Sequence, residues 1–158
     1  MWAIVGSSGF ESFDSFEIVE ELSRETPFGL CSNGLFKVKI DGQEALFLNR
    51  TGLEQNILPH NINYKANIYA LKKHGATSII ALSSVRSLRE ELKPGDMVIP
   101  YQFIDRTKSL RDFTFCEDGL LNYVSLSKPI TESIAEEIRE RKASFNFPIH
   151  FKQSYVCI

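Results

Sequence analysis

Three short segments of the sequence combine small polar residues with a cation in a way that suits an anionic ligand. They are the glycine-serine turn at residues 6–9, residues 49–52 around Arg50, and the serine-rich residues 83–87. Backbone N–H groups and hydroxyls donate hydrogen bonds to oxyanions, and a guanidinium holds phosphate or carboxylate with a planar fork. Taken singly, such a turn is equally typical of an ordinary loop, and such an arginine of solvated surface. Together the segments predict an oxyanion pocket if the fold brings them to one place.

Each of these segments follows a predicted strand. Residues 2–5 form a short apolar run that leads into the glycine-serine turn, and residues 78–82 predict a buried strand that leads into the serine-rich segment. Residues 36–40 alternate apolar and polar side chains, the run Glu-Ala-Leu-Phe-Leu follows at residues 44–48, and Asp41-Gly42 between them favours a tight hairpin turn. The second strand of this hairpin leads to Arg50. The three segments are therefore expected at strand ends, where functional loops commonly lie.

Two helices are predicted between the strands. The clearest begins near Asn61, which suits an N-cap, and ends at Gly75 after a run of basic residues. Thr131 suits the N-cap of the second, in which Glu137 and Arg141 are spaced to pair on the exposed side.

Two further strands complete the pattern. Residues 97–104 predict a strand in which Pro100 indicates a sheet edge or a bulge. Residues 155–158, Tyr-Val-Cys-Ile, predict a buried strand. The alternation of strands and helices, together with the hairpin, predicts an α/β fold with a mixed central sheet flanked by helices.

Composition sets broad limits on the protein. With 158 residues, 43% of them hydrophobic and 24% charged, the chain is expected to form a single domain over residues 1–158. A formal charge of −2 without long charged runs does not favour a nucleic-acid partner or an anionic membrane surface. Cys31, Cys116 and Cys157 lack the spacing of a disulfide framework or a zinc site, so reduced thiols in a cytoplasmic protein are expected. The first ten residues do not have the pattern of a signal peptide or a membrane span.

Longer motifs carry a family resemblance. From Ile4 to Ile158 the chain resembles the purine nucleoside phosphorylase superfamily, and within it the 5'-methylthioadenosine phosphorylase branch. The segments that carry the resemblance are "TPFG", "PHNINYKANIYALKKHGA", "SLREELKPGDMVIPYQFIDRTK" and "YVCI". The resemblance implies a mixed sheet flanked by helices, a homotrimer, and phosphorolysis of a purine nucleoside with phosphate as co-substrate. It implies neither a further cofactor nor a metal.

The family's phosphate contacts can be carried over one at a time. By this resemblance the hydroxyl residue of the glycine turn is Ser8, and the arginine of the loop after the hairpin is Arg50. Two histidines that usually follow this arginine are replaced by Thr51, which still offers a hydrogen-bond donor, and by Gln55. The backbone amide that completes the phosphate cradle belongs to Ser84. The resemblance thus implies phosphate binding by Ser8, Arg50, Thr51 and Ser84.

Two other positions are expected close to the substrate. Arg86 stands where the family has a glycine beside the nucleoside, so it either turns into solvent or reaches the phosphate or purine. Tyr123 is the nearest match to a side chain that a neighbouring subunit lends to the 5' end of the substrate.

The segments that complete the purine and ribose pocket in the family come after the strand at residues 155–158, and no catalytic residue can be assigned in this chain. We therefore expect a phosphorylase of the methylthioadenosine type whose catalysis is impaired. The alternative is a non-catalytic phosphate- or nucleotide-binding remnant, or a partner of a full-length paralogue. A nicotinamide-binding fold is opposed by the hairpin and by the lack of a G-x-G-x-x-G fingerprint.

Overall fold

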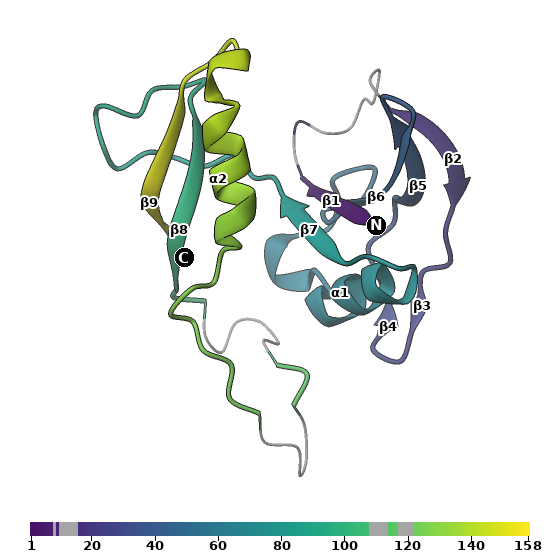
Figure 1. Cartoon of the computed structure of the whole chain (residues 1–158). Coiled ribbons are helices and arrows are strands. Elements are labelled where there is room, and N and C mark those ends of the chain that lie inside the picture. The colour runs from purple at the N-terminus through teal and green to yellow at the C-terminus, as the bar shows by residue number, and fades with distance from the viewer. Residues whose placement is uncertain (8, 10–15, 108–113, 117–121) are drawn as a thin grey trace. The chain divides into compact units, whose positions relative to one another are not determined.

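The computed structural model describes residues 1–7, 9, 16–107, 114–116 and 122–158. The chain divides into two compact units (Figure 1). The first unit contains Met1–Val85 and Leu110–Phe115, and the second contains Arg86–Ser109 and Cys116–Ile158. Two compact units do not decide whether the chain is one domain, so the single domain expected over residues 1–158 stays a prediction.

A five-stranded mixed sheet forms the first unit. Its strands are, in spatial order, β2 (Glu17–Glu21), β5 (Leu35–Ile40), β6 (Gln43–Asn49), β1 (Trp2–Gly6) and β7 (Ser78–Ala81). The pairs β2–β5 and β5–β6 are antiparallel, whereas β1 runs parallel to both β6 and β7. The carboxyl ends of β6, β1 and β7 therefore lie side by side at one edge of the sheet. A separate short pair, β3 (Glu25–Thr26) and β4 (Gly29–Leu30), precedes β5.

The predicted hairpin is confirmed. β5 and β6 pair antiparallel from Ile40 and Gln43 back to Leu35 and Leu48, and Asp41-Gly42 forms the connection. Both connecting residues have positive φ, 49° and 78°, which is the backbone of the turn that matches the twist of a two-residue hairpin. This hairpin fixes the register of β6 and so the place where the chain leaves the sheet at Arg50.

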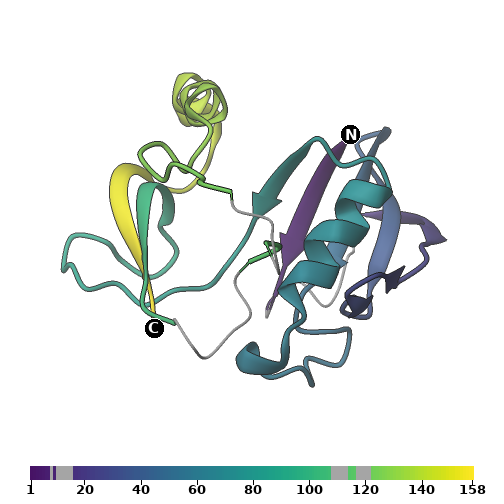
Figure 2. The ribbon, with the colours of Figure 1, turned by 90° about the horizontal axis from the view of Figure 1, so that it is seen from below.

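Helix α1 (Tyr64–Lys73) covers one face of this sheet (Figure 2). Its N-cap is Asn63, whose side chain accepts a hydrogen bond from the Ala66 amide at 3.0 Å. The predicted N-cap, Asn61, is wrong, because the short 3-10 helix η1 (Pro59–Asn61) contains that residue. The helix ends as predicted, with Gly75 at φ 92° just beyond the C-cap His74.

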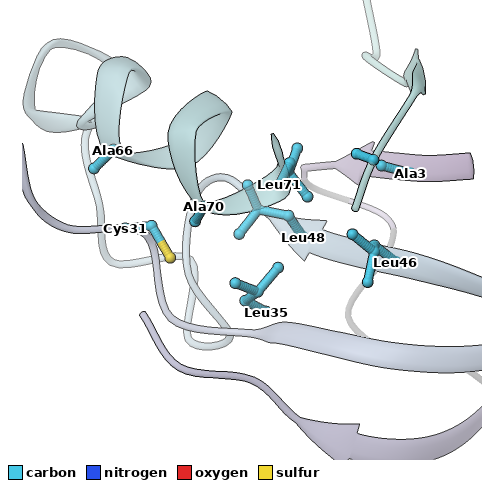
Figure 3. Close-up of a cluster of buried hydrophobic side chains, with 9 residues drawn as sticks. Ala3, Cys31, Leu35, Leu46, Leu48, Ala66, Ala70 and Leu71 are labelled. Carbon is cyan, nitrogen blue, oxygen red and sulfur yellow. The ribbon is translucent and has the colours of Figure 1, made fainter. Parts of the chain in front are cut away.

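The main core lies between α1 and the sheet (Figure 3). Ala70 and Leu71 of the helix face Leu35 and Leu48 of the hairpin, and all four side chains are fully buried. Burying one leucine side chain contributes about 1.5–3 kcal/mol, so this contact accounts for a large share of the first unit's stability. On the other face of the sheet, Phe47 packs against Phe16 with ring centroids 5.9 Å apart.

The second unit is built on a two-stranded parallel sheet. Its elements are β8 (Met97–Asp105), β9 (Ile149–Cys157), helix α2 (Glu132–Glu140) and the 3-10 helix η2 (Lys142–Ser144). The β8–β9 register shifts at Pro100, and Lys152 opposite this shift has φ 60°. The bulge predicted from Pro100 is confirmed, since proline has no N–H to continue the ladder.

Two strands that were predicted to be buried are exposed. Ile79 and Ile80 of β7 are 40% and 39% exposed, because β7 is the edge strand of its sheet. Tyr155 and Val156 of β9 are 36% and 39% exposed. Within the described part of the second unit, Ile149 is the one hydrophobic residue that is buried.

Candidate oxyanion site

The three segments that suit an anionic ligand begin at neighbouring strand ends in the first unit. β1 lies between β6 and β7, with Gly6 opposite Asn49 and Val5 opposite Ala81. The hydrogen bonding continues by one residue on each side. The Arg50 amide donates to the Gly6 carbonyl at 3.1 Å, and the Leu82 amide donates to the Val5 carbonyl at 2.8 Å. As far as the described residues reach, the three segments therefore begin at one edge of the sheet.

Arg50 connects two of the segments through its side chain. Its Nη1 donates a hydrogen bond of 2.9 Å to Oγ of Ser83, so the guanidinium reaches from the end of β6 past the end of β1 to the end of β7. Gly6, with no side chain, lies at the end of the middle strand. The Ser83 hydroxyl accepts in this bond and keeps its own hydrogen for another partner. Among the described residues, the other N–H groups of the guanidinium have no hydrogen-bond partner, so a fork remains to receive an oxyanion.

Ser83 contacts Arg50, whereas the family resemblance points to its neighbour Ser84. The signal was present, since a hydroxyl residue directly after a parallel strand lies at the edge where the neighbouring strands end. Its contact with Arg50, however, joins residues 33 positions apart in the chain. Only the strand order β6-β1-β7 brings the two together.

The backbone that carries Arg50 is held by Asn49. The Asn49 side chain is fully buried, and its Oδ1 accepts hydrogen bonds from the Thr51 amide at 3.2 Å and from Thr51 Oγ1 at 2.9 Å. The Gly52 amide adds a bond of 3.1 Å to the Asn49 carbonyl. Because the single hydroxyl hydrogen of Thr51 points to Asn49, this hydroxyl must rotate before it can donate to a ligand. The Nδ2 of Asn49 is buried without a hydrogen-bond partner among the residues that the structure describes.

Gly52 allows the chain to turn sharply after Arg50. Its φ of 82° is a conformation that residues with a side chain rarely adopt. A Cβ at this position would collide with Oδ1 of Asn33, which accepts a hydrogen bond of 2.9 Å from the Leu53 amide. The turn is therefore closed by a side chain packed directly against the glycine.

The remaining residues assigned by resemblance are spread over both units. Ser8 lies outside the described residues, although its neighbour Ser7 is buried at 5% exposure. Ser84 is exposed at the end of β7, next to Ser83. Arg86 and Tyr123 belong to the second unit, and both are exposed. The structure thus brings Arg50, Thr51 and Ser84 to one sheet edge, and the roles of all these residues stay predictions.

The described residues contain neither a metal-binding cluster nor a membrane-spanning helix. Histidine, cysteine, aspartate and glutamate side chains there do not gather in a group of three that could hold a metal ion. No helix in those parts of the chain is both long enough and apolar enough to span a bilayer.

Comparison with known proteins identifies the family. A family model described as the phosphorylase superfamily matches residues 3–157. The chain belongs to the phosphorylase superfamily. The resemblance seen in the sequence to purine nucleoside and methylthioadenosine phosphorylases is thereby confirmed.

Relatives in this superfamily are similar over nearly the whole of this chain. The S-methyl-5'-thioadenosine phosphorylase of Hyperthermus butylicus is 41% identical over 156 residues, which are 99% of this chain and 57% of the relative. The protein of the same name from Nitrosopumilus maritimus is 41% identical over 155 residues, which are 98% of this chain and 59% of the relative. The chain spans a little over half the length of these curated relatives.

Solved structures in the superfamily confirm the α/β fold. A methylthioadenosine phosphorylase sourced from an antarctic soil metagenomic library superposes with a TM-score of 0.89 at 38% identity, covering 99% of this chain and 55% of that chain. The methylthioadenosine phosphorylase from Schistosoma mansoni in complex with adenine gives a TM-score of 0.86 at 29% identity, covering 99% of this chain and 64% of that one.

Proposed function

We propose that this chain forms the phosphate-binding part of an enzyme that phosphorolyses a purine nucleoside, with 5'-methylthioadenosine as the substrate. The observation that carries the proposal is the side-by-side arrangement of the ends of β6, β1 and β7, across which Arg50 reaches Ser83. The names of the relatives support the choice of nucleoside. In the described residues, Arg50 is the cation at this edge.

The reaction requires groups that hold and orient phosphate. A phosphate oxygen forms a bond to the anomeric carbon of the sugar while the bond from that carbon to the purine nitrogen breaks. The electron pair of the broken bond leaves with the purine, and the products are the free base and a sugar 1-phosphate. Such a reaction depends on positioning and on donors arranged in advance, not on a covalent intermediate with the protein.

In this chain some residues bind phosphate directly, and another orients the guanidinium that binds it. The free N–H groups of the Arg50 guanidinium bind two phosphate oxygens, and Ser83 fixes the plane of the guanidinium by accepting from Nη1. The backbone amide of Ser84 and the hydroxyl of Ser8 supply further donors from the neighbouring strand ends. Thr51 contributes a donor when its hydroxyl turns away from Asn49.

Other features of the proposal follow from the family. The enzyme acts in the cytoplasm as a homotrimer, and Tyr123 reaches the 5' end of the nucleoside in a neighbouring subunit. Arg86 either turns into solvent or reaches the phosphate or the purine. We also propose that catalysis by this chain, which spans a little over half the length of its curated relatives, is impaired relative to theirs.

A second candidate function is a phosphate- or nucleotide-binding module without catalysis, either as a remnant or as a partner of a full-length paralogue. The observation that favours it is the contrast between the oxyanion edge, which lies on a buried core, and the second unit, where Ile149 alone among the described hydrophobic residues is buried. Binding of phosphate needs only the first of these regions.

One pair of measurements tests both candidates. We expect phosphate, at constant ionic strength, to raise the midpoint of thermal unfolding, because a ligand that binds only the folded state stabilises it. Arg50→Met should weaken phosphate affinity roughly 10-fold or more, since the fork is lost. The matched control is Arg89→Met, an exposed arginine of the second unit that pairs with Glu91.

Release of adenine from 5'-methylthioadenosine, followed by chromatography with and without phosphate, separates the candidates. Phosphate-dependent release supports the enzyme, and phosphate stabilisation without release supports the binding module. A chain that is neither stabilised by phosphate nor active contradicts both.

A further inference from the structure

Two buried polar residues lie in the apolar contact between α1 and the segment before β5. Asn67 of α1 and Ser32 are each 4% exposed, and the neighbouring helix residues Ala66 and Ala70 are fully buried. Cys31 directly precedes Ser32 in the chain. Figure 3 shows the side chain of Cys31 beside Ala66 and Ala70 of the helix. Burying polar groups in such a place is costly unless every group finds a partner.

The two residues satisfy one another and then reach the Arg50 backbone. Asn67 Oδ1 accepts a hydrogen bond from the Ser32 amide at 2.8 Å, and Asn67 Nδ2 donates to Ser32 Oγ at 3.1 Å. Ser32 Oγ in turn donates to the carbonyl oxygen of Arg50 at 2.7 Å. These three bonds form a relay that runs from α1 through Ser32 to the loop after β6.

The relay has a fixed direction. A serine hydroxyl has one hydrogen and accepts through its lone pairs. Because Asn67 Nδ2 already donates to Ser32 Oγ, the hydroxyl hydrogen is left to bond with the Arg50 carbonyl. An aspartate at position 67 would only accept, and it would draw that hydrogen away from Arg50.

The relay completes the anchoring of Arg50. The Arg50 amide is held by the Gly6 carbonyl at 3.1 Å, and the Arg50 carbonyl is held by Ser32. Both sides of the residue are therefore fixed to elements of the first unit before any ligand arrives. Within the described parts of the chain, the guanidinium has one hydrogen bond, to Ser83, and its other N–H groups are unbound.

We propose that Asn67 and Ser32 are positioning residues, which hold the Arg50 backbone so that its guanidinium is already directed for phosphate. This inference rests on the proposed function of Arg50. A site that is arranged in advance does not lose affinity to ordering its own groups, and small displacements of such groups are costly. The relay thus links the buried side of α1 to the strength of anion binding at the sheet edge.

Variants of Ser32 test the relay. Ser32→Ala removes the bond to the Arg50 carbonyl, and we expect phosphate affinity to fall roughly 10-fold. Ser32→Thr keeps a hydroxyl and should restore affinity to within about twofold of the unchanged chain. The matched control is Thr26→Val in the first unit, because Thr26 Oγ1 also donates to a carbonyl, that of Gly29 at 2.6 Å, but in the β3–β4 turn. This control should leave phosphate affinity unchanged.

Asn67→Asp tests the direction of the relay without removing Ser32. It should weaken phosphate binding about as much as Ser32→Ala, because the hydroxyl turns to the new carboxylate. If Ser32→Ala and Asn67→Asp lower stability but leave phosphate affinity unchanged, the two residues are merely structural and the inference is overturned.

A measurement without ligand separates this inference from the proposed function. The Arg50 carbonyl and the Thr51 amide belong to one peptide group, so release of the carbonyl should speed hydrogen exchange of the Thr51 amide in Ser32→Ala, and not in Thr26→Val. Unchanged Thr51 exchange overturns the inference whatever phosphate does. Faster exchange in a chain that never binds phosphate supports the anchoring of the loop and contradicts the function proposed for it.

Discussion

The two units differ in how completely they enclose their apolar residues. In the first unit, α1 and the hairpin bury Leu35, Leu48 and Leu71 completely, and the other face of the sheet buries Phe47. In the second unit, only Ile149 among the described hydrophobic residues is buried, although parallel strands are usually covered on both faces. The candidate oxyanion edge belongs to the first unit. The difference teaches that the loops proposed to bind phosphate rest on a core of their own.

The largest effect should come from the core of the first unit. Leu71→Ala removes a fully buried side chain and should lower the free energy of unfolding by about 2–5 kcal/mol. Ile138→Ala, on the partly buried side of α2 in the second unit, should cost roughly 1 kcal/mol or less because little packing is lost. Denaturant unfolding followed by circular dichroism measures both, and the fluorescence of Trp2, the only tryptophan, reports on β1 of the first unit. Equal losses would contradict the contrast between the units.

Next in size is the turn after Arg50. Gly52→Ala should destabilise the first unit by about 1–3 kcal/mol, because alanine is strained at this φ and its Cβ would collide with Asn33. Gly42→Ala is the matched control, since Gly42 also has positive φ but open space around it. The difference in unfolding free energy between the two variants isolates the collision from the strain. If Gly42→Ala costs as much, the packing of Asn33 against Gly52 contributes nothing.

The second unit should respond to acid through Asp96. The pKa of Asp96 is lowered, first by the hydrogen bond from the Lys93 amide at 3.0 Å and also by His150, whose Nε2 lies 2.8 Å from Asp96 Oδ2. A lowered carboxyl pKa stabilises the folded state above the unfolded pKa near 3.9, and this contribution is lost as pH falls through the lower folded value. Stability of the second unit should therefore decline below about pH 4. In Asp96→Asn the free energy of unfolding should depend less on pH in this acidic range. An unchanged pH dependence would argue against a stabilising role of the Asp96–His150 pair.

The smallest effect should come from the surface of α2. Glu137 and Arg141 form the predicted pair, 2.9 Å apart and exposed, so Glu137→Gln should change stability by less than about 0.5 kcal/mol. Glu140→Gln alters the net charge of the same helix equally and serves as the control. A larger loss for Glu137→Gln would mean that α2 depends on this pair more than an exposed helix pair allows.

Local features of the fold could be predicted from the sequence because they depend on neighbouring residues. The hairpin turn at Asp41-Gly42 needs two residues that tolerate positive φ, and the bulge at Pro100 follows from its missing N–H. Asn61 and Asn63 both precede the helix and both suit an N-cap, and only the 3-10 turn that contains Asn61 distinguishes them.

Features that depend on distant partners were not predicted. The exposure of Ile79 and Ile80 follows from the position of β7 at the sheet edge, which an apolar run of residues does not reveal. The contact of Ser83 with Arg50 and the burial of Asn67 against Ser32 also depend on distant partners. Each of these contacts joins residues more than 30 positions apart in the sequence. The hairpin pattern places Arg50 directly after its second strand, but it does not indicate what holds the backbone of that residue in place.

The reactivity of the buried Cys31 thiol can report on local opening of the first unit. Burial raises the pKa of its thiol, with Arg24 acting in the opposite direction, and its side chain is 1% exposed. An alkylating reagent, which attacks the thiolate, can therefore reach Cys31 only when the segment next to Ser32 separates from α1. Cys116 and Cys157 are less buried and should be modified earlier. The rate of the slow phase of thiol labelling therefore reports how often the segment that anchors Arg50 opens, and the chain needs no substitution for this measurement.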